Sequence, residues 1–541
     1  MKTLIESILP LVRKPARYIG NELNSIHKDW DACSLRIALA YPDLYEIGMS
    51  NLGLQILYHI LNSQDDVLAE RVYAPAQDME EKLRENKLSL FSLESWKPLK
   101  DFDLIGFGLG HELTYTNLIN MLELSGIPIY AKDRTDEHPL IFAGGPCAFN
   151  PEPIADFVDF FVIGEAEEVI LEMLNTLRHV ETRGGVLEKL AKLDGVYVPG
   201  ISTSVKKRYV KDIDAIPVPT RPIVPFLRIV HDRAMVEIMR GCKRACKFCS
   251  AFEAYKPVRM RSPEKIKQYA YEILKNTGFD ELSLVSLSSS DYKEIEPLAK
   301  ELSCQLARDM TSLSLPSLRL DSFGVKLAKD ISRVRVASVT AAPEAGTQRL
   351  RDLVGKDLSE EEILKGARVA FEEGITNLKL YFMIGLPTET EEDVAGIVDL
   401  ARRILQLGQE KSKRAHVTVS VSTFIPKPHT PLERERMISF GEIIEKQKYL
   451  KDKLRGRGLE LRWHDANTSI LEGVFSRGDR NLARVIEHAW QLGARLDAWS
   501  EHFRFDLWQQ AFGECGVDMN DYLKAREPQE QLPWEHISCS A

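Results

Sequence analysis

The chain has 541 residues, of which 44% are hydrophobic and 28% are charged. This composition is globular and excludes collagen-like, coiled-coil and wholly disordered proteins, and the length predicts two or three domains. Asp and Glu (80) outnumber Lys and Arg (71), so no overall positive charge exists to hold nucleic acid non-specifically. No apolar stretch is long enough to cross a bilayer, and eight cysteines are too few for a disulfide framework. A cytoplasmic location is therefore expected.

Residues 1–33 are expected to form an N-terminal extension, and residues 34–215 a first domain. In this domain, short apolar runs alternate with amphipathic helical patterns, which is typical of a doubly wound, Rossmann-like α/β sheet. The predicted strands are Leu35–Ala40, Leu104–Leu109, Leu140–Ala143 and Phe160–Ile163. Ligands of such sheets bind at the carboxyl ends of the strands, where turn-forming and glycine-rich segments lie in this sequence.

A proline-containing linker, residues 216–233, is expected to lead into a second α/β domain at 234–431. Its predicted strands are Ala234–Met239, Glu281–Leu287, Ser317–Leu320, Val334–Val339, Asn377–Ile384 and His416–Phe424. Six βα units with right-handed crossovers form a partial (βα)6 TIM-like barrel, open along one side, with its functional loops at the carboxyl ends of the strands. Residues 432–541 are predicted to be mainly helical, with one strand at Leu459–Trp463.

Three of the eight cysteines, Cys242, Cys246 and Cys249, directly follow the first strand of the second domain with the spacing C-x3-C-x2-C. Three thiolates so close together can converge on one inorganic centre. Structural zinc normally takes four protein ligands, and the only nearby histidine, His231, precedes the strand. A 4Fe–4S cluster on three cysteines instead leaves one iron open to a substrate or cofactor. The expected ligand is this cluster; zinc and buried structural cysteines are the alternatives.

The same spacing, with an aromatic residue (Phe248) before the last cysteine in the loop after the first barrel strand, resembles the radical SAM superfamily. The resemblance implies that the three cysteines hold the cluster, that its fourth iron binds S-adenosylmethionine (SAM), and that Phe248 lies against the adenine. An electron from a donor such as flavodoxin or ferredoxin would cleave SAM to methionine and a 5′-deoxyadenosyl radical, which abstracts hydrogen from the substrate. Further implied SAM contacts at later strand ends are Ser288, Ser290, Glu344 and Gly385.

The first domain resembles the cobalamin-binding domains that precede barrels of this superfamily. Asp43, Tyr45 and Gly48 match the spacing of their D-x-H-x-x-G fingerprint, but Tyr45 occupies the place of the axial histidine. Because a phenol ionises only near pH 10, Tyr45 is a poor cobalt ligand at neutral pH. The resemblance thus implies cobalamin without a histidine lower ligand; a scaffold that has lost cobalamin is the alternative. The implied contacts are Asp43, Tyr45, Gly48, Gly144, Gly145 and Glu165.

Most of the chain resembles one group of radical SAM proteins with a cobalamin-binding domain. One departure is Ala245, where this group tends to have glycine. The implied activity is cobalamin-assisted methylation of an unreactive carbon in an unidentified RNA or small molecule. The alternatives are a cobalamin-independent radical SAM enzyme that modifies RNA or rearranges a small molecule, and a non-catalytic iron–sulfur or cobalamin sensor. The segments that carry the resemblance are Pro15–Gly20, Val230–Ala234, Tyr255–Arg259, Arg261–Pro263, Phe424–Pro431 and Arg477–Arg480.

Two other polar positions have more than one interpretation. His429 lies in a proline-stiffened loop after the last barrel strand and either faces the substrate or belongs to a rigid surface turn. His111 and Glu112 follow a strand of the first domain, and a helix-capping role is favoured over contact with cobalamin.

Overall fold

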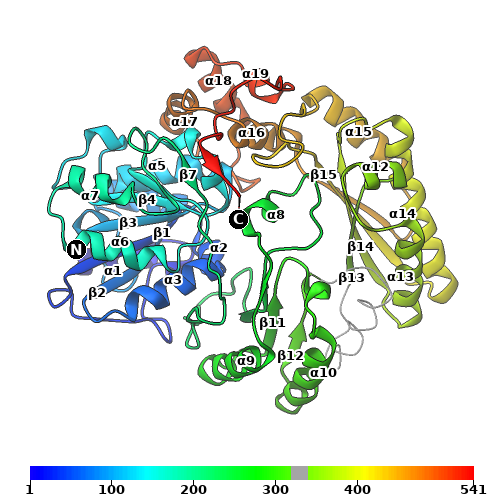
Figure 1. The fold of residues 1–541 in the computed structure, drawn as a ribbon, viewed down its shortest axis with the longest axis horizontal. Helices are drawn as coiled ribbons and strands as arrows, with labels where there is room; N and C mark the ends of the chain where they lie inside the picture. Colours follow the sequence, from blue (N-terminus) through cyan, green and yellow to red (C-terminus); the bar gives the residue numbers. More distant parts are fainter. Residues whose placement is uncertain (318–338, 541) are drawn as a thin grey trace.

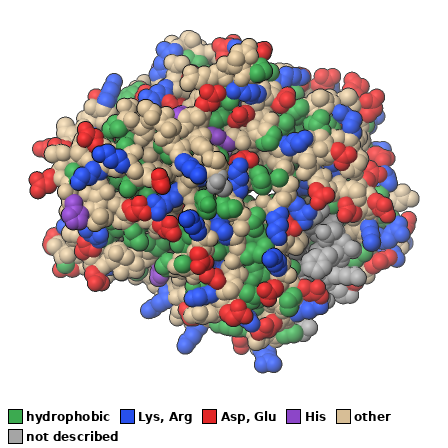
Figure 2. Space-filling model, in the orientation of Figure 1, with side chains coloured by type: hydrophobic (Ala, Val, Ile, Leu, Met, Phe, Trp, Pro, Cys, Tyr) green, Lys and Arg blue, Asp and Glu red, His purple; other side chains and the backbone are tan. Residues whose placement is uncertain are grey.

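The computed structural model describes residues 1–317 and 339–540 of the chain (Figure 1). The first domain and the barrel domain lie side by side, and the C-terminal helices lie across the top of both in this view. Within the described residues, no helix has the length and apolar character required to span a membrane. Acidic and basic side chains are interspersed over the face shown in Figure 2.

The first domain is built on a six-stranded sheet with the order β2-β1-β3-β4-β5-β6. The first five strands are parallel, and β6 is antiparallel to β5. The strands are β1 (Leu35–Tyr41), β2 (Val67–Tyr73), β3 (Leu104–Gly108), β4 (Leu140–Gly144), β5 (Phe160–Val162) and β6 (Val196–Tyr197). The helices are α2 (Tyr45–Gly48), α3 (Leu52–Asn62), α4 (Gln77–Glu85), α5 (Tyr115–Leu124), α6 (Val169–Arg178) and α7 (Arg183–Leu190). The predicted doubly wound sheet is confirmed, and its strand order reverses between β1 and β3, where such folds bind ligands.

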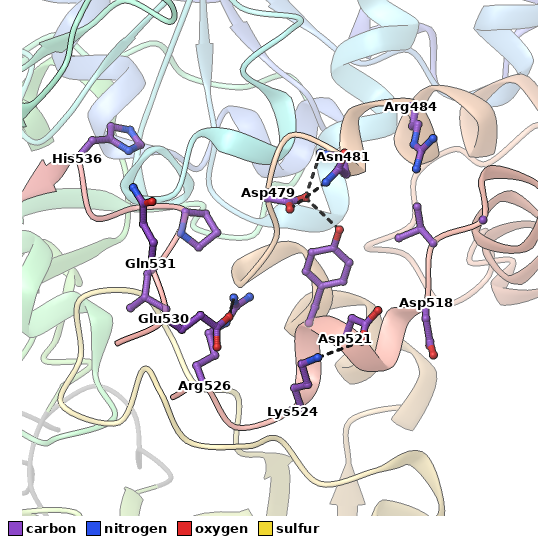
Figure 3. A pocket seen from close by; sticks show the side chains of 15 residues that line it. Asp479, Asn481, Arg484, Asp518, Asp521, Lys524, Arg526, Glu530, Gln531 and His536 are labelled. Carbon is purple, nitrogen blue, oxygen red and sulfur yellow. Dashed lines mark hydrogen bonds and ion pairs between the residues drawn. The ribbon is translucent and has the colours of Figure 1, made fainter. Parts of the chain in front are cut away.

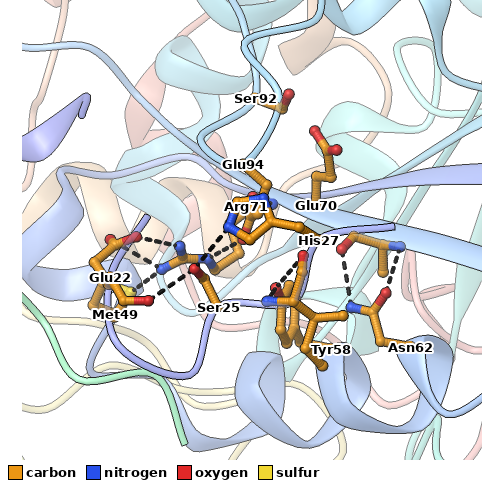
Figure 4. A network of polar contacts seen from close by, with 12 residues as sticks. Glu22, Ser25, His27, Met49, Tyr58, Asn62, Glu70, Arg71, Ser92 and Glu94 are labelled. Carbon is orange, nitrogen blue, oxygen red and sulfur yellow. Dashed lines mark hydrogen bonds and ion pairs between the residues drawn. The ribbon is translucent and has the colours of Figure 1, made fainter. Parts of the chain in front are cut away.

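Strand β2 was not predicted, because Glu70 and Arg71 interrupt its apolar run. All seven of its residues are nevertheless buried. Arg71 lies at the centre of a buried network (Figure 4), in which its guanidinium contacts Glu22 at 2.7 Å and Glu94 at 2.6 Å. Glu22 belongs to the N-terminal extension, which begins with α1 (Lys2–Ile8). The network therefore fixes the extension to the sheet.

The barrel domain contains two parallel sheets, with the orders β12-β11-β8 and β13-β14-β15-β16. The strands are β8 (Ala234–Glu237), β11 (Glu281–Val285), β12 (Ser312–Ser314), β13 (Val339–Glu344), β14 (Asn377–Ile384), β15 (His416–Thr423) and β16 (Leu459–Trp463). A short antiparallel pair, β9 (Met239–Arg240) with β10 (Arg259–Met260), flanks the cysteine loop. The helices are α8 (Ser250–Tyr255), α9 (Pro263–Thr277), α10 (Ile295–Leu306), α12 (Gln348–Leu353), α13 (Glu360–Glu372) and α14 (Glu391–Lys411).

Two of the six predicted barrel strands fall largely outside the described residues. The third is β12 at 312–314, whereas the predicted segment 317–320 has Ser317 in a turn and its other residues outside the described ones. The fourth, β13, begins at Val339; the rest of the predicted segment 334–339 also lies outside the described residues. The described strands at 312–314 and 340–344 were not predicted, because β12 and β13 have mixed burial and no continuous apolar run.

The predicted, mainly helical C-terminal region is confirmed; its strand β16 pairs with β15 of the barrel, and several of its other elements pack against the first domain. Tyr115 of α5 packs against Phe475 of α16 with ring centroids 5.6 Å apart, and the Trp490 indole of α17 donates to Asn120. Strand β17 (Ile537–Ser538) pairs in parallel with β7 (Val205–Lys206). The helices are α15 (Phe440–Lys453), α16 (Ala466–Ser476), α17 (Leu482–Gln491), α18 (Phe505–Cys515) and α19 (Met519–Leu523).

Candidate functional site

The three cysteines lie in the loop between β9 and α8, at the carboxyl end of the first barrel strand. All three are partly exposed free thiols. Within the loop, the Cys249 amide donates to the Cys246 carbonyl at 3.0 Å, and the Lys247 amide donates to Val354 at 2.9 Å. Ala245 has a φ of 51°, in the left-handed region that favours glycine. The loop therefore keeps the backbone turn that a glycine would make, and it leaves the thiols free to bind a ligand.

The separation of the sulfur atoms bears on the identity of this ligand. Among the described residues, one trio of metal-ligating side chains has its ligand atoms within 4.8 Å of one another, and it is not the three cysteines. On a single tetrahedral zinc ion, with Zn–S bonds of about 2.3 Å, the sulfurs would lie about 4 Å apart.

Polar contacts join the cysteine loop to the loop after β11. The Arg244 guanidinium donates to Asp291 at 2.9 Å, and the Ser288 hydroxyl donates to the same carboxylate at 2.8 Å. Ser290 lies in the 3-10 turn that contains Asp291. Two of the predicted SAM contacts, Ser288 and Ser290, are thus brought beside the cysteine loop.

Two further predicted SAM contacts lie in or beside the cysteine loop. Phe248 packs against a small apolar cluster that includes Ala345 after β13 and Leu386 after β14. Glu344, the last residue of β13, has a φ of 68° and bonds Lys356 at 3.0 Å. Burial raises the pKa of Glu344, and its carboxylate lies close enough to Cys246 to affect the pKa of that thiol.

Gly385, in contrast, is explained by protein packing. Its φ is +82°, and a Cβ at this position would lie 2.6 Å from the Ile438 side chain. Its amide already donates to Glu389 at 2.9 Å. Packing alone therefore explains why residue 385 is glycine, without a role in giving SAM close access to the backbone.

A cavity of about 420 Å³ lies between the carboxyl edge of the first sheet and the first strands of the barrel. Its sheet-side wall includes Gly144, Gly145 and Glu165, and its barrel-side wall includes residues 239–241 and 285–287. Gly241 directly precedes the first cysteine of the loop. The structure therefore brings three of the predicted cobalamin contacts to a cavity adjoining the cysteine loop.

The two adjacent positions in this wall, 144 and 145, are glycine for different structural reasons. Gly145 has a φ of +105°, and a Cβ there would lie 2.7 Å from the Leu109 carbonyl, so backbone conformation and packing require glycine. Gly144 lacks a positive φ, and its Cβ would make only ordinary contact, 3.5 Å from the Val162 carbonyl. The protein's own packing does not exclude a side chain at Gly144. The absence of a side chain at Gly144 leaves space for a ligand.

Glu165 forms part of a buried ion-pair network between the two domains. Its carboxylate contacts Arg240 at 3.0 Å and Arg259 at 2.7 Å, and Arg240 also contacts Glu167 at 2.8 Å. Burial would raise the pKa of Glu165, but Arg259 and Arg240 more than offset this and lower it. Because Arg240 precedes Gly241, the network connects the sheet edge directly to the cysteine loop.

Asp43, Tyr45 and Gly48, the other three predicted cobalamin contacts, are not among the residues that line the cavity. Tyr45 is 1% exposed and donates its hydroxyl to Glu22 at 2.9 Å, and a Cβ at Gly48 would lie 2.2 Å from the Tyr73 ring. Asp43 accepts the Trp499 indole N–H at 2.7 Å. These side chains hold the loop to its neighbours. Burial also raises the pKa of Tyr45, so its phenol stays protonated.

A second cavity, of about 190 Å³, adjoins the first and shares Gly110, Pro146 and Tyr255 with it. Both His111 and His429 line it, and His111 also caps the 3-10 turn before α5, the interpretation favoured from the sequence. Sequence reasoning missed two polar residues in its wall, Asn150 and Glu472, because no local motif marks them, whereas Lys427 belongs to the segment Phe424–Pro431 that carries the family resemblance.

A larger, open hollow of about 670 Å³ lies in the C-terminal region (Figure 3). Its charged side chains largely pair with one another: Lys524 contacts Asp521 at 3.2 Å, and Arg526 contacts Glu530 at 2.7 Å. None of the predicted site residues lines it. It therefore contributes nothing to the candidate cofactor sites.

Comparison with known proteins identifies the family. Residues 53–199 match a model described as "Radical SAM proteins, N-terminal", and residues 236–401 match the radical SAM superfamily. An uncharacterized protein of Methanocaldococcus jannaschii is 30% identical over 494 residues, which cover 90% of this chain and 98% of that protein. An uncharacterized methyltransferase of Pyrococcus horikoshii is 23% identical over 50% of this chain and 59% of its own length.

Two solved structures share the fold at 13% sequence identity. One is the radical SAM methyltransferase TsrM from Kitasatospora setae with cobalamin and an iron–sulfur cluster bound, with a TM-score of 0.54 over 74% of this chain and 77% of that chain. The other is the cobalamin-dependent SAM radical enzyme OxsB with aqua-cobalamin bound, with a TM-score of 0.53 over 95% of this chain and 77% of that chain. The chain thus belongs to the radical SAM superfamily and is a radical SAM enzyme with the two-domain fold of its cobalamin-dependent members.

Proposed function

We propose that this enzyme binds cobalamin in the 420 Å³ cavity and methylates an unreactive carbon of its substrate. The observation that carries the proposal is Gly144, a cavity glycine that neither backbone conformation nor internal packing requires. The neighbours TsrM and OxsB, both with cobalamin bound, support the same assignment by fold. The cavity opens beside the cysteine loop, so a methyl donor in it would lie near the SAM site, and proximity of reacting groups lowers the barrier.

The chain's own residues have defined roles in this proposal. Cys242, Cys246 and Cys249 would hold a 4Fe–4S cluster, and Arg244, through Asp291, positions their loop against the barrel. When bound, the cluster supplies the electron that cleaves SAM reductively, and cobalamin supplies a cobalt that carries the methyl group. A one-electron donor such as flavodoxin or ferredoxin is the proposed partner, and the proposed substrate is an RNA or a small molecule.

The lining of the cavity supports binding without a histidine ligand to cobalt. Among the described residues, no histidine lines it, and Tyr45 is engaged with Glu22 instead. We therefore propose that the chain would supply no histidine nitrogen to cobalamin bound in this cavity.

Cobalamin retention by a Gly144→Val variant tests the proposal. Anaerobically purified protein is incubated with hydroxocobalamin and desalted, and the retained cofactor is measured by its visible absorption. Wild-type protein should retain about one equivalent and Gly144→Val less than a tenth of this, because a branched side chain fills the wall. Gly184→Val on the exposed face of α7 is the matched control and should bind normally, since a Cβ there meets nothing within 4 Å.

The EPR spectrum of the bound cobalt(II) state separates the ligand question from binding. No nitrogen superhyperfine splitting is expected, whereas such splitting would refute the absence of a nitrogen ligand. If wild-type protein retains no cobalamin, the methylation proposal fails.

In that case the second candidate stands: a radical SAM enzyme that acts on RNA or a small molecule without cobalamin. The observation that favours it concerns the loop after β1, which resembles the cobalamin fingerprint. There Asp43, Tyr45 and Gly48 all make contacts within the protein.

A further inference from the structure

The smaller, 190 Å³ cavity is walled by segments from all parts of the chain: the loops after β3, β4 and β15, helix α8, and helix α16. Burying charged groups in such a place costs free energy unless each is paired. The hydrogen bonds of its wall therefore reveal which polar atoms the protein satisfies by itself, and which it leaves for a ligand.

The N–H donors of Lys427 are all bonded to other groups of the protein. The Lys427 ammonium has three N–H groups and three acceptors: Glu112 at 2.9 Å, Glu472 at 2.9 Å and the Ser476 hydroxyl at 2.7 Å. Lys427 thus already occupies the cation position between the two carboxylates, which disfavours a metal ion there. The Nδ1 atom of His111 accepts the Leu113 amide, so its proton is on Nε2, 3.5 Å from Glu472.

Two acceptors are left over. Asn150 is 4% exposed, and its amide nitrogen donates to the carbonyls of Ser476 and Gly478 at 3.0 and 2.9 Å, which fixes the orientation of the amide. Its Oδ1 atom is buried without a partner, and an unpaired buried acceptor costs about 1–3 kcal/mol. His429 donates from Nε2 to the Phe149 carbonyl at 2.8 Å, so its Nδ1 atom is also an acceptor, and no described residue bonds to it.

The charges in the wall also favour a ligand that carries hydrogen-bond donors. Three carboxylates line the cavity, Glu112, Glu253 and Glu472, against one lysine, Lys427; Glu253 also pairs with Lys256 outside the lining. A ligand that brings hydrogen-bond donors and a positive charge therefore satisfies both the unpaired acceptors and the excess carboxylate. An anion or a group with acceptors only would leave the Asn150 oxygen unpaired.

We infer that this cavity is a substrate subsite that binds a protonated amine. The inference deepens and rests on the proposed function, because it places the amine-bearing end of the substrate here. The cavity adjoins the larger one at Gly110, Pro146 and Tyr255. A molecule held by its amine thus extends toward the proposed cofactor cavity, where its carbon would react.

Binding of small probes to the full-length protein tests the subsite without SAM or cobalamin. Ligand-observed NMR titrations with n-propylammonium, 1-propanol and propionate compare a cation, a neutral donor and an anion of equal length. The order propylammonium, then propanol, then propionate is expected, with propionate at least tenfold weaker than propylammonium. Equal binding of propylammonium and propionate would overturn the inference.

Three variants locate the binding. Ala251→Leu on α8 narrows the cavity and should weaken propylammonium binding at least tenfold. Phe252→Leu, on the same helix but outside the lining, is the matched control and should not. Asn150→Leu should weaken propylammonium more than propionate. Because Asn150→Leu also removes two hydrogen bonds, its folding is checked by circular dichroism. If it does not fold, the result for Ala251→Leu decides whether the site is correct. An unchanged affinity in Ala251→Leu would refute the site.

Cobalamin retention, measured on the same preparations, separates failure of this inference from failure of the proposed function. Selective propylammonium binding without cobalamin retention would leave an amine subsite and remove the methylation proposal. Cobalamin retention with no preference among the three probes would remove the subsite alone.

Discussion

Two loops at the carboxyl ends of strands, one after β1 and one after β9, show how similar motif signals lead to different outcomes. Both have the spacing of a cofactor fingerprint. After β9, the three cysteines are free thiols beside a cavity wall. After β1, the Tyr45 hydroxyl donates to Glu22 and Asp43 accepts from Trp499, so both side chains are engaged with other segments of the protein. Motif spacing thus indicates the fold, whereas the hydrogen-bond partners of the motif's side chains indicate whether the loop can bind.

The largest expected effect concerns the loop after β9. Cys249→Ala removes one of three cluster ligands and should abolish release of 5′-deoxyadenosine from SAM by the reduced, iron-reconstituted protein, measured by chromatography. Cys304→Ala is the matched control, since Cys304 is exposed on α10. Residual activity in Cys249→Ala comparable to that of the control would contradict the assignment.

The network behind the loop after β1 should be needed for stability. Arg71→Met leaves the buried carboxylates of Glu22 and Glu94 uncompensated, and breaking a buried ion pair in this way costs about 3–5 kcal/mol. Urea unfolding monitored by circular dichroism measures the loss. Arg178→Met removes an exposed pair with Asp66 and should cost at most about 1 kcal/mol. Equal losses would mean that the network is not structural.

Tyr45 offers a sharper test of the same loop. Tyr45→Phe removes its bond to Glu22 and should lower the free energy of unfolding by about 2 kcal/mol, since hydrogen bonds to charged groups are worth about 1.5–3 kcal/mol. Cobalamin retention, measured on the folded variant, should not change. Lost retention at unchanged stability would place Tyr45 at the cofactor after all.

The smallest expected effect is a pH dependence at Asp43. Burial raises its pKa, although bonds from Trp499 and Leu44 act in the opposite direction. The folded state therefore binds this proton more tightly than the unfolded state does. The resulting stabilisation is full below the unfolded pKa of about 3.9 and is lost as the pH rises through the folded pKa.

Asp43→Asn removes this dependence at little structural cost, because both bonds go to Oδ1, which asparagine retains. Urea unfolding at several pH values should show wild-type protein losing stability relative to Asp43→Asn between pH 4 and pH 7. A constant difference across this range would refute the raised pKa.

The parts of the molecule that were predicted from sequence are those with local signals. The cysteine loop, the doubly wound sheet and strand β14 follow from spacing or from continuous apolar runs. Strand β2 was missed because Arg71 and Glu70 are buried charges, whose partners lie in other segments. The amine subsite could not be predicted, because Glu112 and Ser476, which bond to each other in its wall, are 364 residues apart.

This separation also has a consequence for the order of assembly. Contacts between distant residues form late, because the entropy of closing a long loop opposes them. The contacts of the cysteine loop with Asp291 and Val354 lie within the barrel, so the loop can form as soon as the barrel does. The wall at Lys427 and Glu112 must wait until α16 has been synthesised and docked. During synthesis, the chain would therefore be able to hold the radical-generating centre before the substrate subsite exists. Completion of the C-terminal region would then couple radical formation to a bound substrate.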